Sequence, residues 1–306
     1  MDIFVVKKRN LIIASGAAVI CCILMVLLPT TALYSARKGI SLWMKDVLPA
    51  LLPFFICANF LQNIGVIRLL KSGVFPFAMS VLSGYPMGAK IIGDLRRQGE
   101  ISQDEACRLL SFCSTSGPAF MIGAVGAGML GSGAIGMTIA CAHYLGALLN
   151  GFIYGKIYPS GRMVELERAG VRKQSIQEAF TEAIIMSLKS LGIILAYIVL
   201  FMFAADLMNL SGILSLTESQ EIRALIKGIM EMTVGCEAAA ACKAASDSMK
   251  CVICTFIISW GGFSIIGQTM SMLAGTGVSL RYVIITKLTH GLFSAVIAFL
   301  MSIFML

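Results

Sequence analysis

Long apolar stretches separated by short polar ones run along almost the whole chain. A helix needs about 20 consecutive apolar residues to cross a bilayer. Seven stretches meet this requirement, at residues 11–29, 47–65, 106–130, 133–155, 180–208, 251–274 and 282–305. The pattern predicts an all-α polytopic membrane protein with about seven transmembrane helices.

Two further apolar stretches, at 73–93 and 224–246, are interrupted by Gly, Pro and polar residues. Irregular backbone at membrane depth is tolerated only where it is buried in protein or lines a water-filled cavity. A re-entrant hairpin, which enters and leaves the membrane on one side, satisfies this constraint. We therefore predict two re-entrant hairpins in addition to the seven crossings.

The two halves of the chain share one order of elements: span, hairpin, broken span, span. At an offset of 144 residues, Gly117 coincides with Gly261, Ile122 with Ile266 and Gly123 with Gly267. Three crossings is an odd number, so the second unit must be inverted relative to the first. Many secondary transporters are inverted repeats, and their substrate site lies near the bilayer midplane.

The repeat divides the chain into four parts. They are an N-terminal span with a connecting amphipathic segment (1–46), the first repeat (47–158), a cytoplasmic loop (159–179) and the second, inverted repeat (180–306). The first apolar run is longer than a signal-peptide core, so we expect it to be retained as a span.

The distribution of Lys and Arg predicts the orientation in the membrane. With the N-terminus placed inside, fifteen of these residues fall in inside segments and seven in outside segments. Cytoplasmic loops carry the excess of Lys and Arg. We therefore expect a multi-pass protein of the cell membrane with a cytoplasmic N-terminus and an outside C-terminus.

Composition narrows the function. Apolar residues make up 58% of the chain and charged residues 13%, against about 25% charged in soluble domains, so a soluble enzyme is excluded. The net charge of +8 is explained by the Lys and Arg residues that cytoplasmic loops carry in excess. The sequence has no basic cluster with interleaved aromatic residues, so we do not expect nucleic-acid binding. Cys251-x-x-Cys254 has no second pair, and no HExxH, GxSxG or GxxxxGK[ST] motif occurs. We expect no enzyme activity, metal or cofactor, and partners limited to the bilayer, a small-molecule solute and a coupling proton or cation.

The strongest candidate for a binding site is Ser83-Gly84-Tyr85-Pro86-Met87-Gly88-Ala89-Lys90. Gly84 and Gly88 permit close approach of the backbone, and Pro86 prevents a continuous helix. Helix N-termini exposed there would offer N–H groups to a polar or anionic ligand, and Lys90 would add a positive charge. The alternative is a GxxxG contact between helices without a ligand.

Two breaks within spans form the second candidate. Ser114-Thr115-Ser116-Gly117-Pro118 places three hydroxyls where a helix is interrupted; they either cover freed carbonyls or bind solute. Its counterpart, Ser259-Trp260-Gly261-Gly262, lacks the proline but adds Ser264 and Gln268. Polar groups at this depth are costly unless they face the bundle interior. Upstream of the first break, Ser102 and Glu105 form a capping-box pattern that predicts a helix start near Ser102.

Ionisable residues at membrane depth are functional candidates. We predict that Gly235 and Glu237 belong to the tip of the second hairpin, with Glu237 as the residue that couples a proton or cation. Asn59, in the second span, is a further coupling candidate. His143 and His290 are more typical of packed residues, and their roles stay open. Lys287, Lys189, Asp206, Glu231 and Lys243 also lie in these segments.

Two motifs carry a resemblance to a known family. Ser83-Gly84-Tyr85-Pro86-x-Gly88-Ala89-Lys90, a charged helix and then Ser116-Gly117-Pro118-x-Phe120-x-Ile122-Gly123-Ala124-Val125-Gly126 resemble the sporulation integral membrane protein YlbJ family, within the nucleoside-recognition, or Gate, group. The resemblance extends from about residue 48 to 298. Family members usually have Asn where Thr115 stands, so no role is carried over to that side chain.

The resemblance implies a membrane protein needed for spore development, of a family associated with moving dipicolinate across the outer forespore membrane. This small planar dianion would suit Lys90 and the helix N-termini of the hairpin. We therefore expect a sporulation-associated secondary transporter of a small polar or anionic solute that works by alternating access. The alternatives are a nucleoside or cation symporter of the Gate group and a non-transporting spore-envelope assembly protein.

Overall fold

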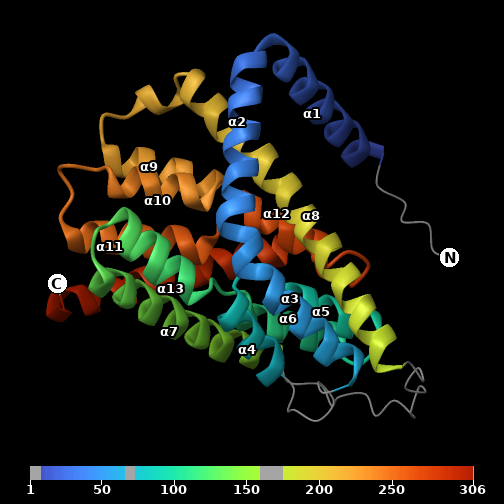
Figure 1. Cartoon of the computed structure of the whole chain (residues 1–306). Coiled ribbons are helices and arrows are strands. Elements are labelled where there is room, and N and C mark those ends of the chain that lie inside the picture. Colours follow the sequence, from blue (N-terminus) through green and yellow to red (C-terminus); the bar gives the residue numbers. More distant parts are fainter. Residues whose placement is uncertain (1–7, 66–72, 159–174, 306) are drawn as a thin grey trace.

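A computed structural model describes residues 8–65, 73–158 and 175–305 (Figure 1). All regular structure in these ranges is helical, which confirms the predicted all-α polytopic class. The helices are α1 (Lys8–Leu27), α2 (Pro29–Leu42), α3 (Leu48–Asn63), α4 (Val74–Ser83), α5 (Met87–Arg97), α6 (Gln103–Cys113), α7 (Gly133–Ile157), α8 (Ile176–Leu210), α9 (Gln220–Met230), α10 (Met232–Ala240), α11 (Asp247–Trp260), α12 (Gly262–Met272) and α13 (Leu280–Met305). Two π-helical segments, Trp43–Val47 and η3 (Ala119–Met129), and the short 3₁₀ helix η4 (Ile213–Leu216) complete them.

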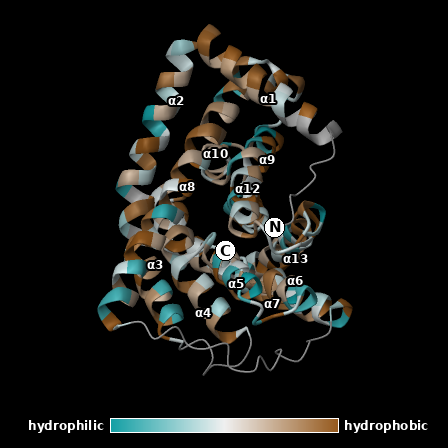
Figure 2. Cartoon of the chain, turned by 90° about the vertical axis from the view of Figure 1, so that its right-hand side faces the viewer, coloured by the Kyte–Doolittle hydropathy of each residue, from teal (hydrophilic) through white to brown (hydrophobic). Residues whose placement is uncertain are grey.

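The segment expected to connect the first two spans is itself helical. α2, the π-helical turn Trp43–Val47 and α3 follow one another without interruption from Pro29 to Asn63. Hydropathy missed α2 because Arg37 and Lys38 lower the apolar content of this stretch. Pro29 suits the first turn of a helix, because backbone N–H groups at that position have no hydrogen-bond partner within the helix. α1 meets α2 at an angle of 105° and leans away from the other helices (Figures 1 and 2).

α8 runs antiparallel to this long helix. At one end the Asn63 side-chain amide donates to the Ala179 carbonyl at 2.9 Å, and at the other the Ser35 hydroxyl donates to the Asp206 carboxylate at 2.5 Å. The α8 N-terminus is fixed by a capping box, in which Ser175 accepts from the Glu178 N–H and Glu178 from the Ser175 N–H. These two helices form one side of the molecule (Figure 1).

α7 and α13, the last spans of the two halves, are also antiparallel. The Asn150 amide of α7 donates to the Thr286 carbonyl of α13 at 3.2 Å, and the His290 imidazole lies 3.0 Å from the His143 carbonyl. Corresponding spans of the two halves thus pair in opposite directions. An inverted repeat requires this relation; the proposed boundaries of the four parts stay a prediction.

The elements between these spans follow the same order in both halves. α4 and α5 form the first hairpin and α9 and α10 the second, while α6–η3 and α11–α12 are the interrupted spans. Ser102 caps α6 by accepting from the Glu105 N–H at 3.1 Å, so the predicted helix start is confirmed. The turn of the second hairpin lies at Glu231, because this carboxylate accepts from the Val234 N–H and starts α10. The prediction that put the tip at Glu237 was wrong by six residues.

Within residues 8–65, 73–158 and 175–305, four helical segments are long and apolar enough to cross a membrane, or five if the bent pair α1–α2 counts as one span. The four are Gly133–Ile157, Ile176–Leu210, Asp247–Met272 and Leu280–Phe304. The expected crossings at 47–65 and 106–130 contain shorter apolar helices, Leu51–Asn63 and Ala119–Met129. In the second of these crossings, Gly117-Pro118 separates α6 from η3.

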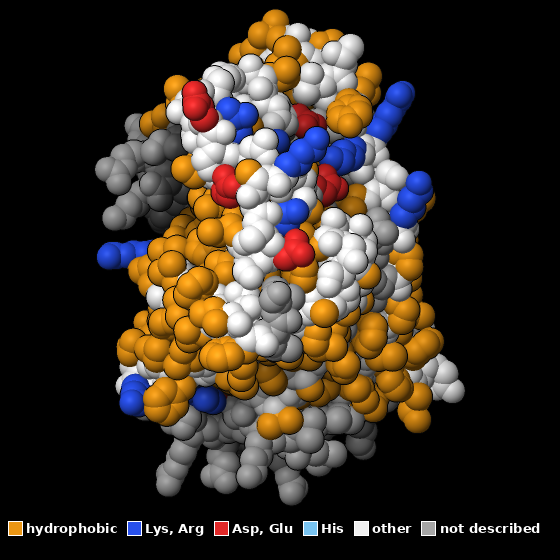
Figure 3. Space-filling model, turned by 90° about the vertical axis from the view of Figure 1, so that its left-hand side faces the viewer, with side chains coloured by type: hydrophobic (Ala, Val, Ile, Leu, Met, Phe, Trp, Pro, Cys, Tyr) orange, Lys and Arg blue, Asp and Glu red, His pale blue; other side chains and the backbone are white. Residues whose placement is uncertain are grey.

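The outer surface is apolar as a bilayer requires. Large side chains such as Phe152, Ile185 and Phe304 are exposed. In Figure 3 a broad band of hydrophobic side chains crosses the face shown, and acidic side chains gather above it.

Candidate functional site

The first hairpin is seated on the break of the first interrupted span. A Cβ atom on Gly84, which has a φ of +79°, would lie 2.7 Å from the Gly117 nitrogen. A Cβ atom on Gly88 would lie 1.7 Å from the Cys113 carbonyl oxygen. The close backbone approach predicted for these two glycines is therefore present, and only glycine fits at either position.

The second hairpin is seated on the second break in the same way. A Cβ atom on Gly262 would lie 3.0 Å from the Met230 carbonyl oxygen and 3.2 Å from the Glu231 Cα atom. Gly235, deeper in the hairpin, would bring its Cβ within 2.3 Å of the Gly228 Cα atom. Each hairpin thus contacts the break of its own half through glycine.

The two breaks and the first hairpin meet at a buried group of polar residues, which we call the central polar cluster. It consists of Tyr85, Ser114, Ser116, His143, Ser259 and Lys287. Lys287 of α13 donates through Nζ to the Tyr85 hydroxyl at 2.6 Å and to the Ser114 carbonyl at 3.1 Å. The same ammonium lies 4.1 Å from the centre of the Tyr85 ring, within the range of a cation–π contact.

Tyr85 connects the first hairpin to the second interrupted span. Its hydroxyl accepts from Lys287 and donates to the Ile258 carbonyl at 3.1 Å, two residues before α11 ends. A phenol that accepts from an ammonium is polarised toward donating to its next partner. The sequence placed Tyr85 at the hairpin, and the structure shows that its hydroxyl reaches the other half of the molecule.

His143 of α7 joins the two breaks directly. The Ser116 N–H donates to its Nε2 atom at 2.9 Å, and its Nδ1 atom lies 2.7 Å from the Ser259 hydroxyl oxygen. The neighbouring Tyr144 hydroxyl donates to the Ser116 carbonyl at 3.0 Å. The first break therefore exposes backbone groups that α7 satisfies, as the irregular backbone of a membrane protein requires.

Two predicted hydroxyls lie next to this cluster. Thr115 is fully buried and bonded to Ser80, with 2.8 Å between the two hydroxyl oxygens. Ser83, at the end of α4, is 5% exposed, and its hydroxyl has no hydrogen-bond partner within the described part of the chain. Thr115 thus stabilises the break, whereas Ser83 has an unused donor beside Gly84 and Gly117.

Lys90 occupies a separate polar site between α3, α5 and α8. Its ammonium lies 2.8 Å from the Asp94 carboxylate and 2.6 Å from the Asn59 carbonyl oxygen. The Asn59 amide in turn donates to Ser187 at 2.8 Å. The two candidates Lys90 and Asn59 are therefore brought together, but away from the hydrogen bonds of the central polar cluster.

The remaining predicted residues lie elsewhere. Ser264 and Gln268 are buried on α12 and hydrogen-bonded to each other at 3.3 Å. Glu237 is exposed on α10 and pairs with Lys38 of α2 at 3.3 Å.

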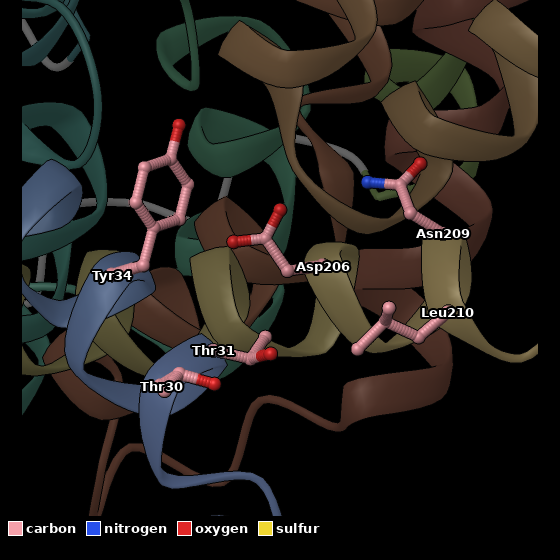
Figure 4. Close-up of a pocket in the computed structure, with 6 residues that line it drawn as sticks. All are labelled: Thr30, Thr31, Tyr34, Asp206, Asn209 and Leu210. Carbon is pink, nitrogen blue, oxygen red and sulfur yellow. The ribbon is translucent and has the colours of Figure 1, made fainter.

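An open groove of about 330 Å³ lies between the start of α2 and the end of α8 (Figure 4). It is lined by Thr30, Thr31, Tyr34, Asp206, Asn209 and Leu210. The side chains of Tyr34 and Asp206 rise from the two helices toward the same side (Figure 4).

Lys287 and His143 are more central to the site than the sequence indicates. Both appeared among the ionisable residues at membrane depth, which was the available signal, but nothing in the sequence shows which residues of α7 and α13 face the breaks. All partners of Lys287 in the described part of the chain are neutral: a phenol, a carbonyl and an aromatic ring. An ammonium in this setting is costly unless an anion joins it. Within the same ranges, no group of three His, Cys, Asp or Glu residues is placed to hold a metal ion.

The fold and the surface together define a multi-pass, all-α integral membrane protein. Its sequence is 28% identical to the Sporulation integral membrane protein YlbJ of Bacillus subtilis (strain 168) over 319 aligned positions, which cover 89% of this chain and 78% of that protein. This similarity confirms the resemblance to the YlbJ family that the two motifs indicate. No family model and no solved structure matches the chain.

Proposed function

We propose that the protein is a sporulation-associated secondary transporter of a small anionic solute. The observation that carries the proposal is the position of Lys287, whose ammonium contacts the first hairpin and the first break without a carboxylate among its described contacts. The name of the B. subtilis relative supports the association with sporulation. We further propose the outer forespore membrane as its location.

The proposed mechanism is alternating access around the central polar cluster. Each hairpin touches the break of its own half through glycine, so moving a hairpin off its break would expose the cluster from one side. Because corresponding spans of the two halves are antiparallel, the two hairpins would open toward opposite sides. The solute would occupy the cluster in between and bring a negative charge to Lys287.

We propose a planar aromatic dicarboxylate, of which dipicolinate is the example, as the solute. One carboxylate would replace the neutral acceptors of Lys287, and the unused Ser83 hydroxyl would donate a hydrogen bond. A flat ring also suits the Tyr85 side chain, since aromatic rings stack or meet edge to face.

The test is solute uptake by proteoliposomes that contain the purified protein. We expect labelled dipicolinate to enter, and Lys287→Met to reduce its uptake by about 30-fold or more, as for the loss of a buried charge partner. Lys189→Met is the matched control, because Lys189 is an exposed lysine within α8, and it should leave uptake unchanged.

Three outcomes would contradict the proposal. Uptake of labelled uridine in place of dipicolinate would indicate a nucleoside symporter. Uptake of neither by inserted protein would indicate an envelope assembly protein. Normal dipicolinate uptake by the Lys287→Met variant would remove Lys287 from the site.

A further inference from the structure

We infer that His143 binds the coupling proton, and that its protonation releases the link between the two helix breaks. This inference rests on the proposed transport function and identifies the ion that accompanies the solute. It is carried by the bridge that His143 forms from Ser116 in the first break to Ser259 in the second.

The hydrogen bonds fix the protonation state of His143 in this conformation. A backbone N–H can only donate, so the Nε2 atom that receives the Ser116 N–H must be unprotonated. The proton of the neutral ring is therefore on Nδ1, which donates to the Ser259 hydroxyl at 2.7 Å. The closed bridge requires a neutral imidazole in one particular tautomer.

Protonation would break one half of the bridge. An imidazolium carries N–H groups on both ring nitrogens, so Nε2–H would face the Ser116 N–H, donor against donor. Ser116 would then lose its acceptor on α7, although Tyr144 would still donate to its carbonyl. The first break would then no longer be held to the second through His143, so the first hairpin and its break could move relative to the other half.

The groups around His143 link this step to the solute. Lys287 and His290 face it from α13, with the His290 ring centre 4.7 Å away, and Tyr85 and Tyr144 meet its ring edge to face. The Lys287 ammonium would repel a second positive charge at His143. An anion beside Lys287 would offset that repulsion, so solute and proton would favour each other's binding by the same factor. The bridge would then open most readily when both are present.

The first experiment measures solute and proton together in proteoliposomes with an enclosed pH dye. With the membrane potential held at zero by potassium and valinomycin, which compensates the net negative charge carried inward, a one-unit pH gradient, acidic outside, should drive about tenfold accumulation of dipicolinate by one-to-one symport, and the lumen should acidify during uptake. His143→Gln should abolish both the response to the gradient and the acidification of the lumen. Lys189→Met should keep the full response.

The second experiment observes the proton itself and does not depend on a His143 variant. The chain has only two histidines, so His290→Gln leaves His143 as its one imidazole. Nitrogen NMR of this ¹⁵N-histidine-labelled variant in lipid, purified without a histidine tag, should show the neutral Nδ1–H tautomer. Added dipicolinate should convert it to imidazolium.

The outcomes separate this inference from the proposed function. Absence of dipicolinate transport by the unmodified protein would overturn both. Transport that ignores the pH gradient, or a His143→Gln variant that keeps the response, would overturn the role of His143 and leave the transporter intact. An Nε2–H tautomer in the NMR spectrum would overturn the bridge itself.

Discussion

The Lys90 ammonium and the Asp94 carboxylate form an ion pair, 2.8 Å apart, on one face of α5 where the two side chains are only 5% and 11% exposed. Asp94 is also bound by Arg97, whereas Asn59 is the one other partner of Lys90 among the residues that the structure describes. The pair is therefore unequal: the carboxylate keeps a cation if Lys90 is removed, but the ammonium keeps no anion if Asp94 is removed.

This inequality predicts different costs for the two single substitutions. We expect Asp94→Ala to destabilise the protein by about 3–5 kcal/mol, because it leaves a buried ammonium unpaired. Lys90→Met should cost less, since it fills similar space and Arg97 still pairs with Asp94. Unfolding in mild detergent measures both, and the double variant should recover most of the loss. Equal costs would contradict the described pairing.

The stability result also separates two explanations of a transport defect. From the sequence we predict that Lys90→Ala abolishes transport while the protein stays in the membrane. If Lys90→Met folds normally and still fails to carry solute, Lys90 acts in transport directly. If transport survives, its role is confined to holding α5 against α3.

Gly88→Ala should prevent the first hairpin from seating. The added Cβ atom would lie 1.7 Å from the Cys113 carbonyl oxygen, a backbone atom that cannot rotate away. We expect a loss of about 1–3 kcal/mol or more in unfolding free energy. Gly192→Ala on α8 is the matched control, because a Cβ atom there meets nothing within 4 Å, and it should be neutral or slightly stabilising. A normal thermal melt for Gly88→Ala would contradict the close contact.

Tyr85→Phe should weaken solute transport and leave the hairpin folded. The substitution removes the hydroxyl that accepts from Lys287 and donates to Ile258, but it keeps the ring under the ammonium. Hydrogen bonds to charged groups contribute about 1.5–3 kcal/mol, so the apparent solute affinity should change by about 10-fold or more. Concentration-dependent uptake measures this change. Tyr34→Phe, in the outer groove, serves as the control and should behave as wild type.

Glu237→Gln should leave stability almost unchanged. Its ion pair with Lys38 joins side chains that are 45% and 39% exposed, and such pairs contribute less than about 1 kcal/mol. A loss of transport in this variant could then be assigned to coupling, as the sequence predicts. Wild-type uptake under a proton gradient would instead remove Glu237 from the mechanism.

The sequence was sufficient for much of the fold. Hydropathy located α7, α8 and α13 to within a few residues, and Ser102 marked the start of α6. α2 was missed because Arg37 and Lys38 lie on a helix that packs against α8 rather than in a loop. Glycine and proline revealed both breaks, since Gly117-Pro118 and Gly261-Gly262 interrupt helices whatever surrounds them.

The site was harder to predict, because it depends on which helix faces which. Lys90 is followed four residues later by Asp94, but periodicity does not show that both side chains are buried. His143 and Ser259 are 116 positions apart and meet only when α7 and α11 pack. The turn of the second hairpin is set by one side-chain bond from Glu231 to the Val234 N–H, and nothing in the apolar pattern distinguishes Glu231 from Glu237.

The uninterrupted helix from Pro29 to Asn63 and its antiparallel partner α8 also determine how deep the protein sits. Thirty-five residues of α-helix extend about 50 Å, well beyond the roughly 30 Å of hydrocarbon, and a tilt of up to about 40° does not remove the excess. One end of this pair must therefore lie among lipid headgroups or in water. The groove end, with Thr30, Thr31 and Asp206, is polar enough to be that end. A change in bilayer thickness would then shift this pair of helices along the bilayer normal. The depth of both hairpins in the membrane would change with it.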